Sequence, residues 1–255
     1  MIAPRPLPTN PVIVASSELV DDRLEPSSQT GTFKLRIASS AVGTREEPAF
    51  SVGTSRAKRA LDVALICLCL PVVFPVMVAI AAAIKLDSKG PILLYQRRVG
   101  RNGRAFKMWK FRSMIEGAEE KLEAYLAADP TARAEWAETQ KLKNDPRVTP
   151  LGRILRRTSL DELPQLWNIL VGDMSLVGPR PIVRDEIDRY QAVYPLYMQS
   201  RPGLTGLWQV SGRSNTSYAR RIVLDKIYIR RWSFAMDIGI LLRTIPAVLF
   251  GRGAY

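Results

Sequence analysis

The sequence contains no histidine and only two cysteines among its 255 residues. The absence of histidine excludes Ser-His-Asp and Cys-His triads, histidine zinc sites and imidazole proton shuttles. Cys67 and Cys69 lie in one apolar run, too close together on a helix for a comfortable disulfide, so they indicate a reducing compartment. Acid–base or nucleophilic chemistry must therefore use Asp, Glu, Lys, Tyr, Ser or Cys.

Acidic residues are outnumbered, with 24 Asp and Glu against 37 Lys and Arg and a net charge of +13. This excess predicts an anionic partner, which could be nucleic acid, a phosphorylated substrate or an acidic lipid surface. No helix-turn-helix, zinc or RNA-binding signature accompanies the charge, and the apolar run Val63–Ile84 is unlike a nucleic-acid-binding protein. We therefore expect no nucleic-acid partner.

Three regions follow from composition. Residues 1–55 are rich in Pro, Ser, Thr and Ala without sustained apolar periodicity, which predicts a disordered N-terminal tail; "FKLRIASS" is a candidate strand with nothing around it to form a core. Residues 56–89 form the apolar segment with its basic flanks. Residues 90–255 are expected to form one folded domain. Its helical patterns and its β-prone stretches predict an α+β fold that is mainly helical.

The apolar segment has basic residues on both flanks and two prolines, Pro71 and Pro75, near its middle. Each proline removes a backbone donor and favours a break or kink. A re-entrant helix hairpin in one leaflet explains both features, because both basic ends then stay on one side. A kinked spanning helix remains the alternative, and a buried soluble helix fits less well because the run is apolar on all sides.

The next segments alternate strand and helix signals. Two β-prone stretches flank Asn102-Gly103, which predicts a short β-hairpin. A polar helical pattern from Ile115 to about Lys143 is divided into two helices by Pro130, and Thr149-Pro150 begins a short helix through Arg157. The glycine-rich "RPGLTGLWQVSGR" surrounds a short strand and matches neither a P-loop nor a Rossmann fingerprint.

The C-terminal stretch from Tyr218 alternates basic and apolar residues at helical spacing, interrupted by Asp237 and Arg243. This pattern predicts amphipathic interfacial helices with Trp232 near the lipid headgroups. Packing of the same stretch into a soluble core is the alternative.

The stretch "RRTSLDELPQLWNIL" carries the candidate chemistry. Ser159 and Glu162 have the spacing of a capping box, which places Asp161 and Glu162 in the first turn of a helix. The two acids could simply complement the helix dipole. They could also react, because a helix N-terminus attracts phosphate and keeps a carboxylate ionised, and an ionised aspartate can attack phosphorus.

A second candidate is Arg180, which is bracketed by Pro179 and Pro181. The prolines restrict its backbone to extended forms, and a guanidinium held in this way suits bidentate phosphate binding. A structural loop with an exposed arginine is the alternative.

The order of motifs resembles a known family. "KRALDV" precedes a proline-broken apolar run, followed by "YQRRVGRNGRAFKMWKFRSM", "DPRVTPLGRILRRTSLDELPQLWNILVGDMSLVGPRP" and "RPGLTGLWQVSGR". This series, from Lys58 to the end, is similar to the bacterial sugar transferases, the monotopic polyprenyl-phosphate hexose-1-phosphate transferases. Among these it looks closest to the exopolysaccharide-initiating undecaprenyl-phosphate galactosyl-phosphate transferases.

The resemblance implies transfer of a hexose 1-phosphate, galactose or glucose, from a UDP-sugar to undecaprenyl phosphate, with release of UMP. It implies that Asp161 attacks phosphorus, that Glu162 completes the dyad, and that Mg²⁺ lies near Asp161. Phosphate or dyad contacts would fall on Lys110, Arg156 and Arg180. The expected location is the bacterial inner membrane, with the catalytic domain on the cytoplasmic face and anionic lipids as partners.

The resemblance also favours the re-entrant hairpin. Some members bend at a Ser-Pro pair, whereas this sequence has Phe74-Pro75, so the hydroxyl that could satisfy a freed carbonyl is missing. Pro71 can move part of the break one turn earlier. The alternative function is a catalytically silent basic membrane scaffold for polysaccharide assembly, which the intact dyad and bracketed arginine disfavour. The sequence leaves the hexose, the oligomeric state and the role of the tail open.

Overall fold

The computed structural model describes residues 55–139, 142–212 and 216–249. All of them belong to one compact unit, Glu46–Tyr255. The predicted disordered tail and the candidate strand "FKLRIASS" lie outside the described residues. Only Ser55, at the end of that predicted tail, is described, and it is the N-cap of the first helix.

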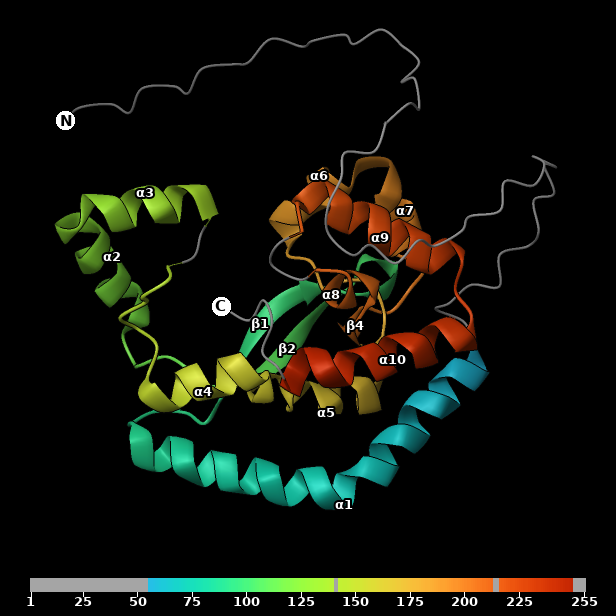
Figure 1. Ribbon diagram of the computed structural model, residues 1–255, viewed down its shortest axis with the longest axis horizontal. Coiled ribbons are helices and arrows are strands. Elements are labelled where there is room, and N and C mark those ends of the chain that lie inside the picture. Colours follow the sequence, from blue (N-terminus) through green and yellow to red (C-terminus); the bar gives the residue numbers. More distant parts are fainter. Residues whose placement is uncertain (1–54, 140–141, 213–215, 250–255) are drawn as a thin grey trace, which may run out of the picture. The chain divides into compact units, whose positions relative to one another are not determined.

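The longest element is helix α1 (Arg56–Asp87), about 48 Å long at the usual rise per residue. It is long and apolar enough to cross a membrane. The predicted hairpin is not confirmed, since α1 is one continuous helix that contains Pro71 and Pro75 and changes direction partway along its length (Figure 1). Each proline removes only one bond of the helical ladder, and the bonds on either side continue the helix through a bend.

Both halves of α1 pack against the same body. Ile66, in the first half, contacts the core cluster that contains Met108 and Ile169. Ile80 and Ile84, in the second half, belong to a cluster with Phe111 and Leu155. Large apolar side chains elsewhere on α1 are exposed: Leu68, Leu70, Val72, Phe74, Val76, Val78 and Leu86.

The predicted β-hairpin is confirmed as strands β1 (Leu93–Val99) and β2 (Ala105–Phe111), which pair antiparallel. Asn102 and Gly103 in the turn have φ of 58° and 72°, the left-handed region that Asn and Gly adopt most readily. Arg98 lies opposite Phe106, and Lys110 lies opposite Leu94. Because alternate residues of a strand share a face, Arg98 and Lys110 are on the same face of the hairpin.

A second, parallel pair consists of β3 (Ser175–Val177) and β4 (Gly203–Thr205). The sequence predicted the second strand but not the first. A Cβ on Gly203 would lie 2.1 Å from the backbone nitrogen of Gly178, so the two backbone segments are too close together for a side chain to fit between them. This contact fixes the start of the loop that carries Arg180.

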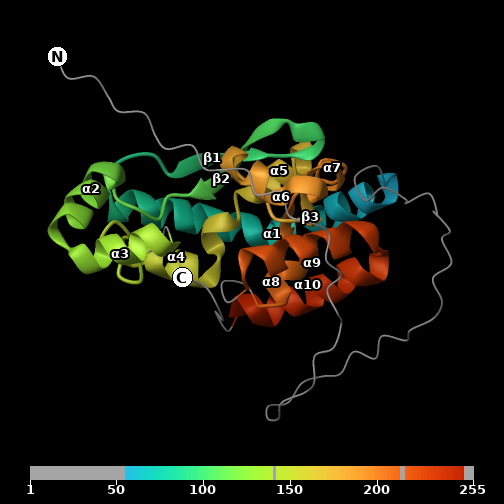
Figure 2. The ribbon, with the colours of Figure 1, turned by 90° about the horizontal axis from the view of Figure 1, so that it is seen from above.

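Several helices surround these strands. Their bounds are α2 (Ala118–Ala128), α3 (Pro130–Thr139), α4 (Pro150–Thr158), α5 (Gln165–Val171), α6 (Ile187–Tyr190), α7 (Tyr194–Tyr197), α8 (Leu207–Val210), α9 (Tyr218–Arg230) and α10 (Phe234–Leu249). The predicted division at Pro130 is confirmed, and α2 and α3 lie side by side in Figures 1 and 2.

The C-terminal stretch forms two helices, α9 and α10, and both pack against α8 (Figure 2). Ile240 of α10 and Tyr228 of α9 are buried with Val177 in one core cluster, which agrees with core packing. Other apolar side chains of α10 are exposed, among them Phe234, Ile238, Leu242 and Ile245. The two helices therefore have both a core face and an exposed apolar face.

Candidate active site

The dyad lies in a tight connection between two helices. Helix α4 begins as predicted, with the Thr149 hydroxyl accepting the Gly152 N–H. The predicted capping box at Ser159 is wrong, because Ser159 instead ends α4 with a left-handed backbone (φ 57°) and its side chain caps nothing. Asp161 and Glu162 occupy a 3₁₀ turn, η2 (Leu160–Glu162), before α5 begins.

Lys110 of β2 connects the two acids. Its ammonium nitrogen is 2.7 Å from Oε1 of Glu162 and 3.6 Å from Oδ2 of Asp161. Asp161 is buried, with 7% of its surface exposed, whereas Glu162 is more open. The single positive charge of Lys110 therefore interacts with a buried carboxylate and with a more exposed one.

The pKa of Asp161 is raised above its ordinary value. Burial raises it most, the ammonium of Lys110 lowers it, the charge of Glu162 raises it and the guanidinium of Arg156 lowers it. The prediction that this carboxylate lies in the first turn of an α-helix is wrong. Asp161 lies in η2 and not on the first turn of α5, so burial decides the direction.

Arg156 lies on α4, near enough to Asp161 for their charges to interact. Its Nε donates to Oγ of Ser113 at 2.8 Å, which fixes the side chain. Burial lowers its pKa, and the charges of Asp161 and Asp145 raise it. The structure thus brings together Asp161, Glu162, Lys110 and Arg156.

Asn168 of α5 positions Lys110 and was not singled out from the sequence. Its side-chain oxygen accepts the Trp109 N–H at 3.1 Å, and its side-chain nitrogen donates to the carbonyl of Lys107 at 2.8 Å. This buried amide attaches β2 to the helix that follows the dyad. A polar residue on an apolar helix was the only sequence signal for it.

Arg180 lies apart from the dyad. Within the described residues no hydrogen bond or ion pair joins its side chain to Asp161 or Glu162. Its guanidinium lies over the ring of Trp208, 5.1 Å from the centroid, and its backbone N–H donates to Asp225. The predicted phosphate contacts therefore lie in two places: Lys110 and Arg156 beside the dyad, and Arg180 beside Trp208.

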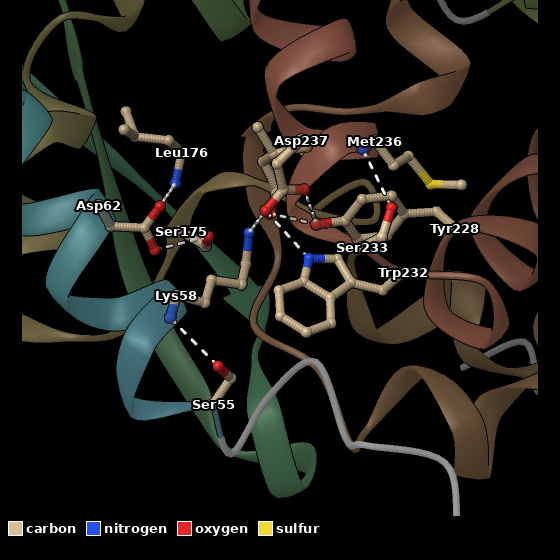
Figure 3. A network of polar contacts seen from close by, with 11 residues as sticks. Ser55, Lys58, Asp62, Ser175, Leu176, Tyr228, Trp232, Ser233, Met236 and Asp237 are labelled. Atoms are coloured by element: carbon tan, nitrogen blue, oxygen red, sulfur yellow. Dashed lines mark hydrogen bonds and ion pairs between the residues drawn. The ribbon is translucent and has the colours of Figure 1, made fainter. Parts of the chain in front are cut away.

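A buried polar network holds the start of α1 against the domain (Figure 3). Nζ of Lys58 is 2.6 Å from Oδ2 of Asp237, which also accepts from Trp232 Nε1, while Oδ1 accepts from the Tyr228 hydroxyl. Trp232 is thus half-buried beside Lys58. Separation of α1 from α10 would leave the buried charges of Lys58 and Asp237 without partners, so this network holds the two helices together.

Two neighbouring residues of α1 extend this attachment. Asp62 accepts from the hydroxyl of Ser175 and the N–H of Leu176, at the start of β3. Arg59 donates to the carbonyls of Ile169 and Leu170 at the end of α5. The helix that follows the dyad is therefore fixed at its far end by the apolar helix.

The sequence model of the bacterial sugar transferases matches residues 53–251. The chain belongs to the bacterial sugar transferase family. This sugar transferase is therefore an enzyme, a phosphoglycosyl transferase.

Named relatives of this sugar transferase come from several bacteria. It is 48% identical to the exopolysaccharide production protein ExoY of Rhizobium meliloti over 199 residues, 78% of this chain and 88% of that protein. It is 48% identical over 198 residues to the undecaprenyl-phosphate galactose phosphotransferase of Salmonella typhimurium, covering 78% of this chain and 41% of that protein. It is 40% identical over 206 residues to the UDP-glucose:undecaprenyl-phosphate glucose-1-phosphate transferase of Escherichia coli, with 78% and 41% covered.

The carboxylates near Asp161 are the candidate ligands for magnesium. The described residues contain no group of three or more His, Cys, Asp or Glu side chains that could hold a metal. The site of this sugar transferase offers two carboxylates, both of which form ion pairs with Lys110. Mg²⁺ commonly binds through one or two carboxylates together with substrate phosphate oxygens, so the residues fit an ion that arrives with its substrate.

Proposed function

We propose that this enzyme transfers a hexose 1-phosphate from a UDP-sugar to undecaprenyl phosphate, releases UMP and begins exopolysaccharide synthesis. The names of the relatives support the lipid acceptor and an exopolysaccharide product, and they include both galactose and glucose transferases. The observation that carries the proposal is the buried carboxylate of Asp161 beside the ammonium of Lys110.

In the proposed first step, a carboxylate oxygen of Asp161 attacks the phosphorus that carries the sugar. The bond from that phosphorus to the bridging oxygen breaks, and the electron pair leaves with UMP. In the second step, an oxygen of undecaprenyl phosphate attacks the same phosphorus and releases the aspartate. Two substrates then use one phosphate site in turn, which predicts ping-pong kinetics.

The other residues of the site offset charge. Lys110 lies between the acids, and Arg156 is held by Ser113, so both cations are positioned before substrate arrives. A Mg²⁺ ion held by Asp161 would supply further positive charge to the diphosphate. Glu162 holds Lys110 in place at 2.7 Å and leaves the carboxylate of Asp161 less tightly paired.

We propose that α1 is re-entrant and lies in the cytoplasmic leaflet of the bacterial inner membrane, with the domain on the cytoplasmic side. Both ends of α1 are attached to the same body, at Lys58 and Asp237 near the start and at Ile84 and Arg112 near the end. A helix that crosses the bilayer carries one end away from a domain on one face. Exposed apolar residues on α1 and α10 support insertion into lipid, and the basic net charge supports attraction to anionic headgroups.

The test is a donor panel of radiolabelled UDP-sugars with undecaprenyl phosphate, scored by lipid-linked label and UMP release. The Asp161→Asn variant is expected to lose more than about 10³-fold in turnover, because the amide cannot attack phosphorus. Asp185→Asn is the matched control, since Asp185 precedes a glutamate in another 3₁₀ turn, η3 (Arg184–Glu186), but is exposed. It should retain full activity.

The expected intermediate is a sugar phosphate on Asp161, seen by mass spectrometry after quenching with donor alone. An adduct on another side chain, or full activity in Asp161→Asn, would contradict the mechanism. The scaffold alternative predicts no label in lipid with any donor. A nucleic-acid-binding protein would bind DNA, whereas we expect salt-sensitive binding to anionic liposomes only.

A further inference from the structure

Three arginines that are not part of the dyad lie around the loop that follows β3. Arg180 follows β3, Arg221 is on α9, and Arg98 is on β1. The guanidinium of Arg221 is 4.5 Å from the centroid of the Trp208 ring, and that of Arg180 is 5.1 Å from it. Arg98 joins them through its Nη1, which is 3.5 Å from the carbonyl of Pro181. Residues from distant parts of the chain thus form one cationic cluster.

The cluster contains buried polar atoms that have no partner among the described residues. They are Nε of Arg98, Arg180 and Arg221, Nε1 of Trp208 and the hydroxyl of Tyr218. Each can donate a hydrogen bond, and a buried donor left unbonded destabilises a protein. Five unsatisfied donors in one cluster indicate that an acceptor with several oxygens belongs there.

The acids near this cluster accept hydrogen bonds from other groups, although Oδ1 of Asp225 is buried without a partner among the described residues, and Asp225 interacts with the charges of Arg180 and Arg221. Asp225 accepts from the Tyr190 hydroxyl at 2.8 Å and from the Arg180 backbone N–H at 3.3 Å. Glu186 accepts from the backbone N–H of Val183. Within the described residues, none of the arginines Arg98, Arg180 and Arg221 forms an ion pair. Their positive charge is therefore available to a ligand.

One member of the cluster, Arg98, also lies toward the dyad. Arg98 shares a face of the β-hairpin with Lys110, which contacts both acids of the dyad. Burial lowers the pKa of Arg98, and the charge of Arg180 lowers it further, whereas Glu186, Tyr197 and Glu162 raise it. Arg98 is thus close enough to interact with Arg180 on one side and Glu162 on the other.

We propose that Arg98, Arg180 and Arg221 bind the phosphate of the leaving nucleotide, next to the phosphorus that Asp161 attacks. This inference rests on the proposed function and adds a second phosphate subsite to it. A diphosphate then lies with one phosphate at Lys110 and Arg156 and the other at the three arginines.

The subsite has a specific chemical task. When Asp161 forms its bond to phosphorus, the bond to the bridging oxygen breaks, and that oxygen gains negative charge on the nucleoside monophosphate. No proton is needed, because fixed guanidinium donors can stabilise this charge as it develops. The lipid phosphate in the second step does not need these arginines, since no nucleotide is then bound.

The direct test measures UMP binding by calorimetry, without turnover. Arg221→Gln should weaken UMP binding about tenfold or more, because one charged donor is lost. Arg220→Gln is the matched control: it removes the same charge from the next position of α9, where the side chain is exposed, and should bind UMP like the unchanged enzyme. Arg98→Gln gives a second variant on another element, and thermal unfolding of each variant checks that it folds.

Kinetics then distinguish the source of the phosphate. In Arg221→Gln, inhibition by UMP should weaken by the same factor, while kcat/KM for undecaprenyl phosphate stays unchanged. A lowered kcat/KM for the lipid with unchanged UMP binding would overturn the proposal and place the lipid phosphate here. If the enzyme transfers sugar and folded Arg221→Gln and Arg98→Gln both bind UMP normally, the subsite is wrong while the proposed function stands. If no donor supports transfer, the function fails, yet UMP binding still tests the cluster.

Discussion

At the scale of residues, Asp161 holds a carboxylate in a place that disfavours its charge. Burial raises its pKa, and two nearby cations, Lys110 and Arg156, partly oppose that effect. A nucleophile that is neither fully hydrated nor tightly paired reacts more readily than a solvated carboxylate. The same arrangement makes the ionised form less favourable in the folded state than in the unfolded chain.

The raised pKa of Asp161 predicts where activity is lost in acid. In the proposed mechanism the ionised carboxylate is the nucleophile, so kcat/KM should fall as pH drops through a value above 3.8, the ordinary value for aspartate. Lys110→Met removes a charge that lowers this pKa and should move the acid limb of the residual activity to higher pH. Glu162→Gln removes a charge that raises it and should move the limb to lower pH.

The raised pKa of Asp161 also makes the stability of the fold depend on pH. A folded pKa above the unfolded value means that this carboxyl stabilises the fold at low pH, and the contribution is lost as pH rises through the folded pKa. In Asp161→Asn that loss should disappear, so its unfolding midpoint at neutral pH should exceed that of the unchanged enzyme. In the pH profiles of kcat/KM, shifts of the acid limb in the same direction for Lys110→Met and Glu162→Gln would contradict the causes given for the raised pKa of Asp161.

At the scale of elements, helix α4 is placed by a glycine. A Cβ on Gly152 would lie 2.0 Å from the carbonyl oxygen of Ser113, which also accepts the Thr149 N–H. The start of α4 therefore packs directly on the backbone just after β2. Arg156 reaches Ser113 from the same helix, so this contact also positions a cation of the site.

Gly152→Ala should therefore destabilise the protein by about 3 kcal/mol or more, because rigid backbone must move. The measurement is the shift of the unfolding midpoint together with turnover. Gly239→Ala is the control, since a Cβ there meets nothing within 4 Å and Gly239 lies within helix α10. That change should be neutral or stabilise by up to about 1 kcal/mol. Equal effects of the two substitutions would show that close packing at Gly152 is not important.

At the scale of the whole described unit, the proposed insertion into the membrane depends on α1. Its first turns are fixed by Lys58 and Asp62, and its last turns by Ile84 and Arg112. The exposed apolar side chains between these attachments include Phe74, which is 60% exposed. The bent helix can therefore insert its middle in lipid while both ends stay with the domain.

Cysteine labelling tests this arrangement. With Cys67 and Cys69 changed to serine, single cysteines at Ala57 and Asp87, both exposed, should react with a charged maleimide from the same side of sealed vesicles. A cysteine in place of Phe74 should react only after detergent. Labelling of positions 57 and 87 from opposite sides would show a spanning helix.

Local signals explain what could be predicted. Asn102-Gly103 predicted a hairpin turn, Pro130 a division between helices, and Thr149 a helix cap, and each is confirmed because its cause lies within a few residues. The capping box at Ser159 had the right spacing, but tight packing of α4 against η2 gave Ser159 a left-handed backbone instead. Strand β3 was missed because it pairs with a partner more than 20 positions away.

The sequence by itself determined the family and the long apolar helix with its two prolines, and it predicted the candidate dyad. Only the tertiary structure decided which charges meet. Lys110 reaches Glu162 across 52 positions, and Lys58 reaches Asp237 across 179. Burial, and therefore the direction in which the pKa of Asp161 shifts, depends on all the elements packed around it, and no local pattern of residues contains that information.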